Sequence, residues 1–222
     1  MITFGGIYIG TYEISLKIVE MSGAMNDAEQ QKIVEDFGRL KMSKWDDVNV
    51  IRTVVTVYRT EAKKARKRYW EVAFEAYILA MIILGEDGRK TQQMADKSIT
   101  MEWVDSFLEE TNPVTQYRFN SETERKAYRL AEQLEVTPDR NMAIDRAMKD
   151  WSRQIGQYAI DFTDHAVVQA FRDAGIDQVE WETEKDERTC HSCSGLDGKI
   201  FQIEEIPAKP HYGCRCRLKP IQ

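Results

Sequence analysis

Cysteine is absent from this 222-residue chain before Cys190, and two of the three histidines also lie in the last fifth of the sequence. The first residues lack both the basic start and the long apolar centre of a signal peptide or membrane anchor. We therefore expect the chain to stay in a reducing compartment, where disulfides are rare and clustered thiols more often bind metal.

Several patterns typical of enzymes are missing as well. The sequence has no glycine-rich phosphate loop and no ordering of serine, histidine and aspartate that predicts nucleophilic catalysis. Acidic residues pair as neighbours, as in Asp46-Asp47 and Glu109-Glu110, and adjacent side chains do not face each other across a site for acid/base work. We predict a protein that is not an enzyme and has no small-molecule substrate.

An excess of positive charge is also missing, since the formal net charge is -6 at pH 7. A surface built as a whole for nucleic acid is therefore not expected. The basic run at residues 59–68, RTEAKKARKR, could contact DNA, but a solvated helix face is favoured. The apolar run AYILAMIIL at residues 76–84 is shorter than the ~20 residues that cross a bilayer, so no membrane contact is predicted.

Helical periodicity covers most of the sequence. Apolar residues recur every three or four positions in long segments, and Gly85 and Gly175 stop two of them. A capping box at residues 121–124 opens another segment, whereas residues 85–98 are predicted as a polar turn. The sequence predicts a mainly α fold, an elongated helical body with a long central helix. The predicted helices span residues 26–40, 43–84, 101–108, 121–134 and 140–174.

The chemically most specific segment is the cysteine-rich end. Cys190-x-x-Cys193 has the spacing at which two thiolates grip one metal ion, and His211-x-x-Cys214-x-Cys216 follows closely enough to complete the same site. Such ligands favour tetrahedral, structural Zn²⁺, with every position filled by protein. The candidates outnumber the four positions: Cys190, Cys193, His211 and Cys214 are preferred, and Cys216 is the alternative to His211.

Two other interpretations of the cysteines stay open. A pair of disulfides would suit an oxidising compartment, and a redox-active CxxC pair would open a helix after a strand. The flanks of Cys190 instead indicate loop and strand, which favours the metal. His191, beside a predicted ligand, is expected to point elsewhere, and His165, within a helix, is expected to be structural.

Short strands are predicted around the cysteines, at residues 175–181, 200–206 and 214–219, with an Asp197-Gly198 hairpin turn. Strands this short bury too little apolar surface to hold together alone, so the metal would staple them while Trp181 packs them onto the helices. The predicted domains are an N-terminal arm at residues 1–25, a helical domain at 26–175 and a zinc-binding β module at 176–222.

The cysteine-rich end resembles the signature of the phage head morphogenesis family, the minor head proteins related to phage Mu protein F and to the minor head protein of phage SPP1. The chain has Tyr212-Gly213 where the family more often has a proline after the histidine, which spares the candidate ligands. Upstream, Thr163-Asp164 takes the place of a Thr-Glu pair usual in the family. The matching positions are Trp181, Thr183, Asp186, Cys190, Cys193, Leu196-Asp197-Gly198-Lys199, Phe201, Pro210-His211, Cys214-Arg215-Cys216 and Pro220.

This resemblance implies a minor capsid protein of a tailed bacteriophage, with a structural role at or near the portal in head assembly that extends to DNA packaging or ejection. It implies the portal protein, other capsid components and phage DNA as partners. The implied location is the virion, in the capsid interior or portal region, and the host cytoplasm during assembly. The alternative is a nucleic-acid-binding zinc module, with Arg215, Arg217 and Lys219 at its tip and residues 59–68 as a second contact.

Overall fold

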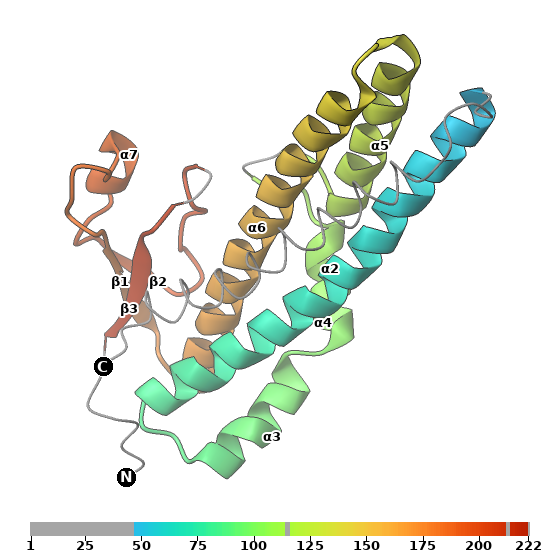
Figure 1. Ribbon diagram of the computed structural model, residues 1–222. Helices are drawn as coiled ribbons and strands as arrows, with labels where there is room; N and C mark the ends of the chain where they lie inside the picture. The colour runs from blue at the N-terminus through green and yellow to red at the C-terminus, as the bar shows by residue number, and fades with distance from the viewer. Residues whose placement is uncertain (1–46, 114–115, 212–213, 222) are drawn as a thin grey trace, which may run out of the picture. The chain divides into compact units, whose positions relative to one another are not determined.

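The computed structural model describes residues 47–113, 116–211 and 214–221 (Figure 1). The predicted N-terminal arm at residues 1–25, the predicted helix at 26–40 and the predicted start of the next helix at residue 43 lie outside this part of the chain. Within it, the chain is mainly helical with a small C-terminal sheet, which confirms the mainly α fold class.

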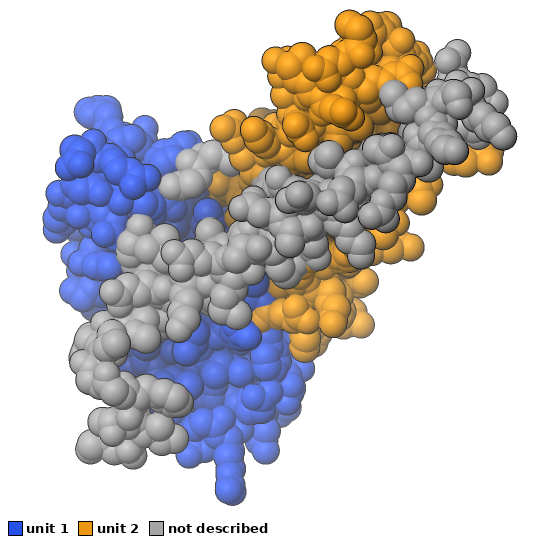
Figure 2. Space-filling model, in the orientation of Figure 1, with its two compact units in different colours: residues 1–20, 72–99, 160–222 blue, residues 21–71, 100–159 orange. Residues whose placement is uncertain are grey.

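The chain divides into two compact units (Figure 2). Unit 1 contains Val72–Ile99 and Ile160–Gln222, and unit 2 contains Thr100–Ala159 together with the described residues up to Glu71. The two longest helices described, α2 (Asp47–Ile83) and α6 (Arg140–Asp173), each contribute to both units. The predicted domain boundaries stay predictions.

Unit 2 is built from α4 (Met101–Glu109), α5 (Phe119–Val136) and the unit 2 portions of α2 and α6. Its core is aromatic, and the Phe119 ring lies at its centre. The centroid of that ring lies 5.0 Å from Tyr158, 5.7 Å from Tyr69 and 5.9 Å from Trp151. Aromatic residues placed at helical spacing therefore meet across helices in mainly edge-on and tilted contacts, as their charge distribution favours.

In unit 1, side chains from three helices meet at one carboxylate. Asp173, the last residue of α6, accepts hydrogen bonds from the Tyr77 hydroxyl at 2.6 Å and from the Ser98 hydroxyl at 2.5 Å. Tyr77 lies on α2, and Ser98 ends α3 (Gly88–Ser98). Gly175, at φ +76°, then ends the α6 segment in the left-handed conformation that glycine favours, as the sequence predicts.

Helix α3 corrects the prediction of a polar turn at residues 85–98. The segment GRKTQQMADKS shows little apolar periodicity because its buried face consists of two small residues, Thr91 and Ala95. The Asp87 side chain caps the helix by accepting from the backbone N–H groups of Arg89 and Lys90. A cap and a narrow buried face are therefore enough for a helix that hydrophobic pattern alone misses.

Helix α5 corrects the prediction of a capping box at residues 121–124. The helix begins at Phe119, two residues earlier, and its N-cap Arg118 makes no side-chain capping bond. The acidic residue of the box has another partner, because Glu124 accepts a hydrogen bond from Arg59 at 2.8 Å. Burial of Phe119 in the core draws the helix start forward.

The strands described form one antiparallel sheet in the order β2-β1-β3 (Figure 1). They are β1 (Gln178–Glu182), β2 (Ile200–Gln202) and β3 (Arg217–Ile221). Val179 pairs with Phe201, and Trp181 pairs with Leu218. Val179, Trp181 and Leu218 are buried, so the small sheet has one apolar face.

Two predicted strands and one turn need correction. The strand predicted at residues 200–206 stops at Gln202, because the Glu205 N–H closes a turn onto the Gln202 carbonyl at 2.8 Å. The strand predicted at residues 214–219 begins only at Arg217. The Asp197-Gly198 pair makes a turn but does not join two paired strands. The strand that follows it, β2, pairs with β1, which precedes the cysteine pair in the sequence.

Candidate metal centre

The cysteine pair opens a one-turn helix, α7 (His191–Ser194). Cys190 is its N-cap, and its Sγ accepts from the Cys193 backbone N–H at 3.4 Å. The sequence predicts loop and strand around this pair; the loop before it is present, and the helix after it corrects the prediction. A turn of helix aims both thiols to the same side, which is the arrangement that a shared metal ion requires.

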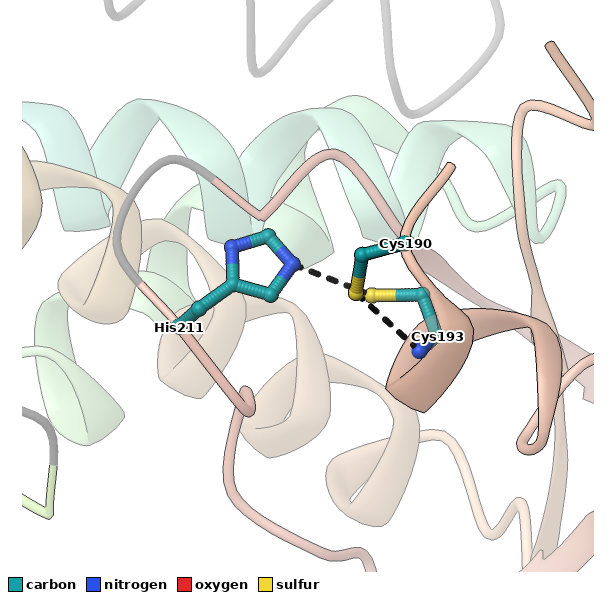
Figure 3. Close-up of side chains that lie close together, drawn as sticks. All are labelled: Cys190, Cys193 and His211. Atoms are coloured by element: carbon teal, nitrogen blue, oxygen red, sulfur yellow. Dashed lines mark hydrogen bonds between the residues drawn. The ribbon is translucent and has the colours of Figure 1, made fainter. Parts of the chain in front are cut away.

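Two triads of ligand atoms lie at this end of unit 1. One contains Cys190, Cys193 and His211, and the other contains Cys193, Cys214 and Cys216. Within each triad all ligand atoms lie within 4.8 Å of one another. Figure 3 shows the first triad, with the His211 ring and the two thiols directed toward one another. Because Cys193 belongs to both triads, the five side chains form one cluster.

The distances from the Cys193 sulfur fit one tetrahedral ion. It lies 3.2 Å from His211 Nε2 and 3.6 Å from the Cys214 sulfur. Two ligands of a tetrahedral zinc ion, with bonds of ~2.3 Å to sulfur and ~2.0–2.1 Å to nitrogen, lie roughly 3.5–3.8 Å apart. All four cysteines are free thiols. The cluster could therefore hold a metal ion.

The structure thus brings together all five predicted ligand candidates, namely Cys190, Cys193, His211, Cys214 and Cys216. The preferred set of four spans both triads, and which four bind stays a prediction. His191 is exposed and belongs to neither triad, and neither does His165 on α6. The Tyr212-Gly213 departure from the family pattern lies outside the described residues.

The thiols differ in how readily they lose a proton. Burial raises the pKa of Cys193 to about 12, whereas the Cys193 N–H lowers the pKa of the more exposed Cys190 to about 7. The hydrogen bond between Cys214 and Cys216 raises the pKa of Cys214 and lowers that of Cys216. Binding a metal requires thiolates, so it would release protons from this cluster.

A lysine lies beside the three-cysteine triad. The Lys209 ammonium donates to the Cys216 carbonyl at 2.6 Å and lies 2.9 Å from Asp164 Oδ2 on α6. Its side chain is only 13% exposed. Burial opposes its charge, but the charge of Asp164 and, once they are deprotonated, the charges of Cys214 and Cys216 outweigh that effect and raise the pKa of Lys209. The ammonium is therefore held charged next to the cluster.

Two sets of side-chain hydrogen bonds, Asp197 with Thr183 and Asp186 with Arg215, hold the chain around the cysteines, and we call them clasps. The Asp197 carboxylate accepts from both the backbone N–H and the hydroxyl of Thr183, each at 2.9 Å. Arg215, between two cysteines, donates through two nitrogens to Asp186, at 2.7 and 2.8 Å. This pairing holds the pKa of the Asp186 carboxyl well below its usual range. The resemblance points to these residues, but their sequence separation conceals that they pair.

The basic residues proposed for DNA contact are largely paired within the protein. On α2, Arg59 pairs with Glu124 at 2.8 Å, and Arg66 pairs through two nitrogens with Asp105. In the sheet, Arg217 pairs with Glu182 at 2.6 Å, and Lys219 lies 3.5 Å from Glu180. These carboxylates offset much of the positive charge that phosphates would need.

The cavity beside the cluster is small. Its volume is about 30 Å³, and its lining includes Cys190, His211 and Arg215. Small-molecule sites usually enclose about 300–1,000 Å³, roughly ten times more or above. This cavity has room for little more than a water-sized group.

No helix in the described residues is long and apolar enough to cross a membrane. The family model described as phage Mu protein F like protein matches residues 86–219, which is more than half of the chain. The match includes α3 to α6, strands β1 and β2, the start of β3 and the whole cysteine cluster. No curated protein and no solved structure matches the chain significantly.

Proposed function

The chain belongs to the phage Mu protein F-like family of phage head morphogenesis proteins, and from this premise we propose that it is a minor capsid protein of a tailed bacteriophage. Its role is structural, at or near the portal during head assembly, and extends to DNA packaging or ejection. Its partners are the portal protein and other capsid components. It resides in the virion after assembly in the host cytoplasm.

The cysteine cluster holds structural Zn²⁺ in this proposal. Sulfur and imidazole ligands at tetrahedral separations support zinc over harder cations, which prefer oxygen. The small cavity beside the cluster supports a metal centre that takes no substrate. That the protein is not an enzyme is part of the same proposal. When bound, zinc would supply the cross-link between α7 and the loop that carries His211, Cys214 and Cys216.

Docking to protein is favoured over a nucleic-acid-binding zinc module. The observation that carries this choice is the pairing of Arg215 with Asp186 and of Arg217 with Glu182, which offsets charge at the tip of the module. The positive charge of residues 59–68 is offset in the same way, because Arg59 and Arg66 are paired with carboxylates. A rigid module with a balanced surface charge suits a protein neighbour better than a polyanion.

Co-sedimentation with the portal assembly of the same phage tests this function. We expect the purified chain to sediment with the portal at physiological salt, and double-stranded DNA added as a competitor to leave that binding intact. A matched Cys214→Ser variant, with a disturbed module, separates docking through the module from docking through the helices. Capture by DNA alone, with a steep loss as salt rises, would contradict the proposal and favour the nucleic-acid alternative.

A further inference from the structure

We propose that Lys209 is the built-in counter-cation of the metal centre. This inference rests on the proposed metal site and assigns a role to a residue that is not a metal ligand. Residues around first ligands commonly orient them and tune the affinity for the ion. Here the outer group carries a full positive charge next to a set of thiolates.

The contacts of Lys209 place its charge beside the cysteines. Its ammonium donates to the backbone carbonyl of Cys216 at 2.6 Å, so it lies against the loop segment that carries the thiols of Cys214 and Cys216. The carboxylate of Asp164, a residue in the unit 1 part of α6, lies 2.9 Å from the same ammonium. With 13% of its side chain exposed, Lys209 is shielded from the solvent that screens most surface lysines.

The negative charge of a zinc–thiolate centre explains why a positive group at the position of Lys209 would stabilise it. Zinc with three thiolates and one imidazole carries a net charge of about −1, and zinc with four thiolates carries about −2. Removing such an anion from water is unfavourable unless a positive group lies close to it. The positive charge of Lys209 beside the cysteine loop therefore stabilises the metal-bound form more than the protonated, metal-free form.

A simpler interpretation is that Lys209 and Asp164 form a latch, an ion pair that holds the loop in place and exerts no electrostatic effect of its own on the metal. The two interpretations differ in symmetry. A latch is broken equally by removing either partner, so Lys209→Met and Asp164→Asn would weaken metal binding alike. A counter-cation is lost only in Lys209→Met, because Asp164→Asn leaves the positive charge and its bond to the Cys216 carbonyl in place.

The experiment measures zinc affinity of the full chain by competition with a chromophoric chelator. We expect Lys209→Met to lower affinity by about 10- to 100-fold and Asp164→Asn to change it by less than about 3-fold. Lys219→Met is the matched control, since it removes the same charge from a side chain that is 60% exposed beside Glu180. That control should leave the affinity unchanged.

Equal losses in Lys209→Met and Asp164→Asn would overturn the proposal in favour of the latch, and so would an unchanged affinity in Lys209→Met. If Lys209→Met does not fold, Lys209→Arg should keep most of the affinity, and a large loss in Asp164→Asn still contradicts the proposal. Failure of the metal site itself is distinguishable, because then the unmodified chain would take up no zinc.

Discussion

The aromatic core of unit 2 and the small sheet of unit 1 are stabilised in different ways. In unit 2, Phe119, Trp151 and Tyr158 are almost fully buried and touch one another, so apolar contact holds the helices. The sheet has strands of three to five residues and is flanked by charged clasps and five potential metal ligands. In our proposal, metal coordination and ion pairs stabilise the sheet where apolar side-chain packing stabilises unit 2.

The difference follows from size. A few short strands expose much of their surface, so they bury too little apolar area to offset the entropy of ordering the chain. A structural metal supplies that stabilisation from a handful of side chains. Mutations should therefore affect the two regions through separate mechanisms, and the following predictions test that separation from the largest expected effect to the smallest.

The largest effect is expected from Cys193→Ser, because Cys193 belongs to both ligand triads. Structural zinc sites contribute roughly 10–16 kcal/mol of apparent binding free energy, so losing the shared ligand should unfold the sheet. We expect zinc to be lost and the amides of residues 178–221 to lose protection in hydrogen exchange, while helices α4 and α5 stay protected.

His191→Asn is the control for this change, because His191 is exposed in the same short helix and outside both triads. It should keep zinc and protection. If the Cys193→Ser chain keeps a protected sheet, the contrast between the two regions disappears.

The second prediction concerns the aromatic core. Phe119→Ala should lower the free energy of unfolding of unit 2 by about 3–5 kcal/mol, because it removes a buried ring that contacts three others and leaves a cavity. Denaturant unfolding followed by helical circular dichroism measures the change. Zinc stoichiometry should be unaffected. Tyr128→Ala, at a side chain that is 49% exposed on the same helix, should change little.

The third prediction concerns the clasp between Asp186 and Arg215. Its hydrogen bonds lower the pKa of Asp186 in the folded chain, so this carboxylate stabilises the module above its unfolded pKa of about 4 and loses that effect as the pH falls further. Asp186→Asn should therefore reduce hydrogen-exchange protection of the module at pH 5–7, with a shrinking difference from the unmodified chain in stronger acid.

Glu187→Gln removes the same charge from the exposed neighbouring residue and serves as the control. It should leave protection and its pH dependence unchanged. An equal loss in both variants would mean that general acidity, and not the clasp, stabilises this loop.

The smallest effect is expected at Gln154, on α6 in unit 2. Gln154 is 2% exposed, and neither atom of its amide group has a hydrogen-bond partner among the residues that the structure describes. Gln154→Leu should stabilise unit 2 by about 1 kcal/mol, because it removes an unpaired buried polar group. Gln157, equally buried on the same helix, has an interaction partner, so Gln157→Leu should destabilise. Denaturant midpoints measure both.

Sequence pattern predicts the two regions unequally well. The helix expected at residues 140–174 is observed as Arg140–Asp173, since its many apolar residues recur at helical spacing. Helix α3 is missed because its buried residues, Thr91 and Ala95, are small. The start of α5 is misplaced because tertiary burial of Phe119 outweighs the local capping signal.

At the cysteine-rich end, the spacing of the cysteines and of His211 predicts which residues gather, but not that they form two triads. All five candidate ligands meet, yet their grouping around the shared Cys193 depends on how α7 and the loop after His211 fold back on each other. The ion pair between Asp164 and Lys209 likewise cannot be predicted from sequence pattern, because 45 positions separate the two residues and only the fold brings them together. Local signals cannot specify contacts made at that distance along the chain.

The metal content of the full chain, purified without added zinc, tests most directly whether a metal replaces an apolar core at the C-terminal end. We predict about one zinc ion per chain by elemental analysis, with sulfur ligands at ~2.3 Å by X-ray absorption. Chelation should then abolish hydrogen-exchange protection of residues 178–221. A chain that carries no metal and still protects these residues would contradict the account.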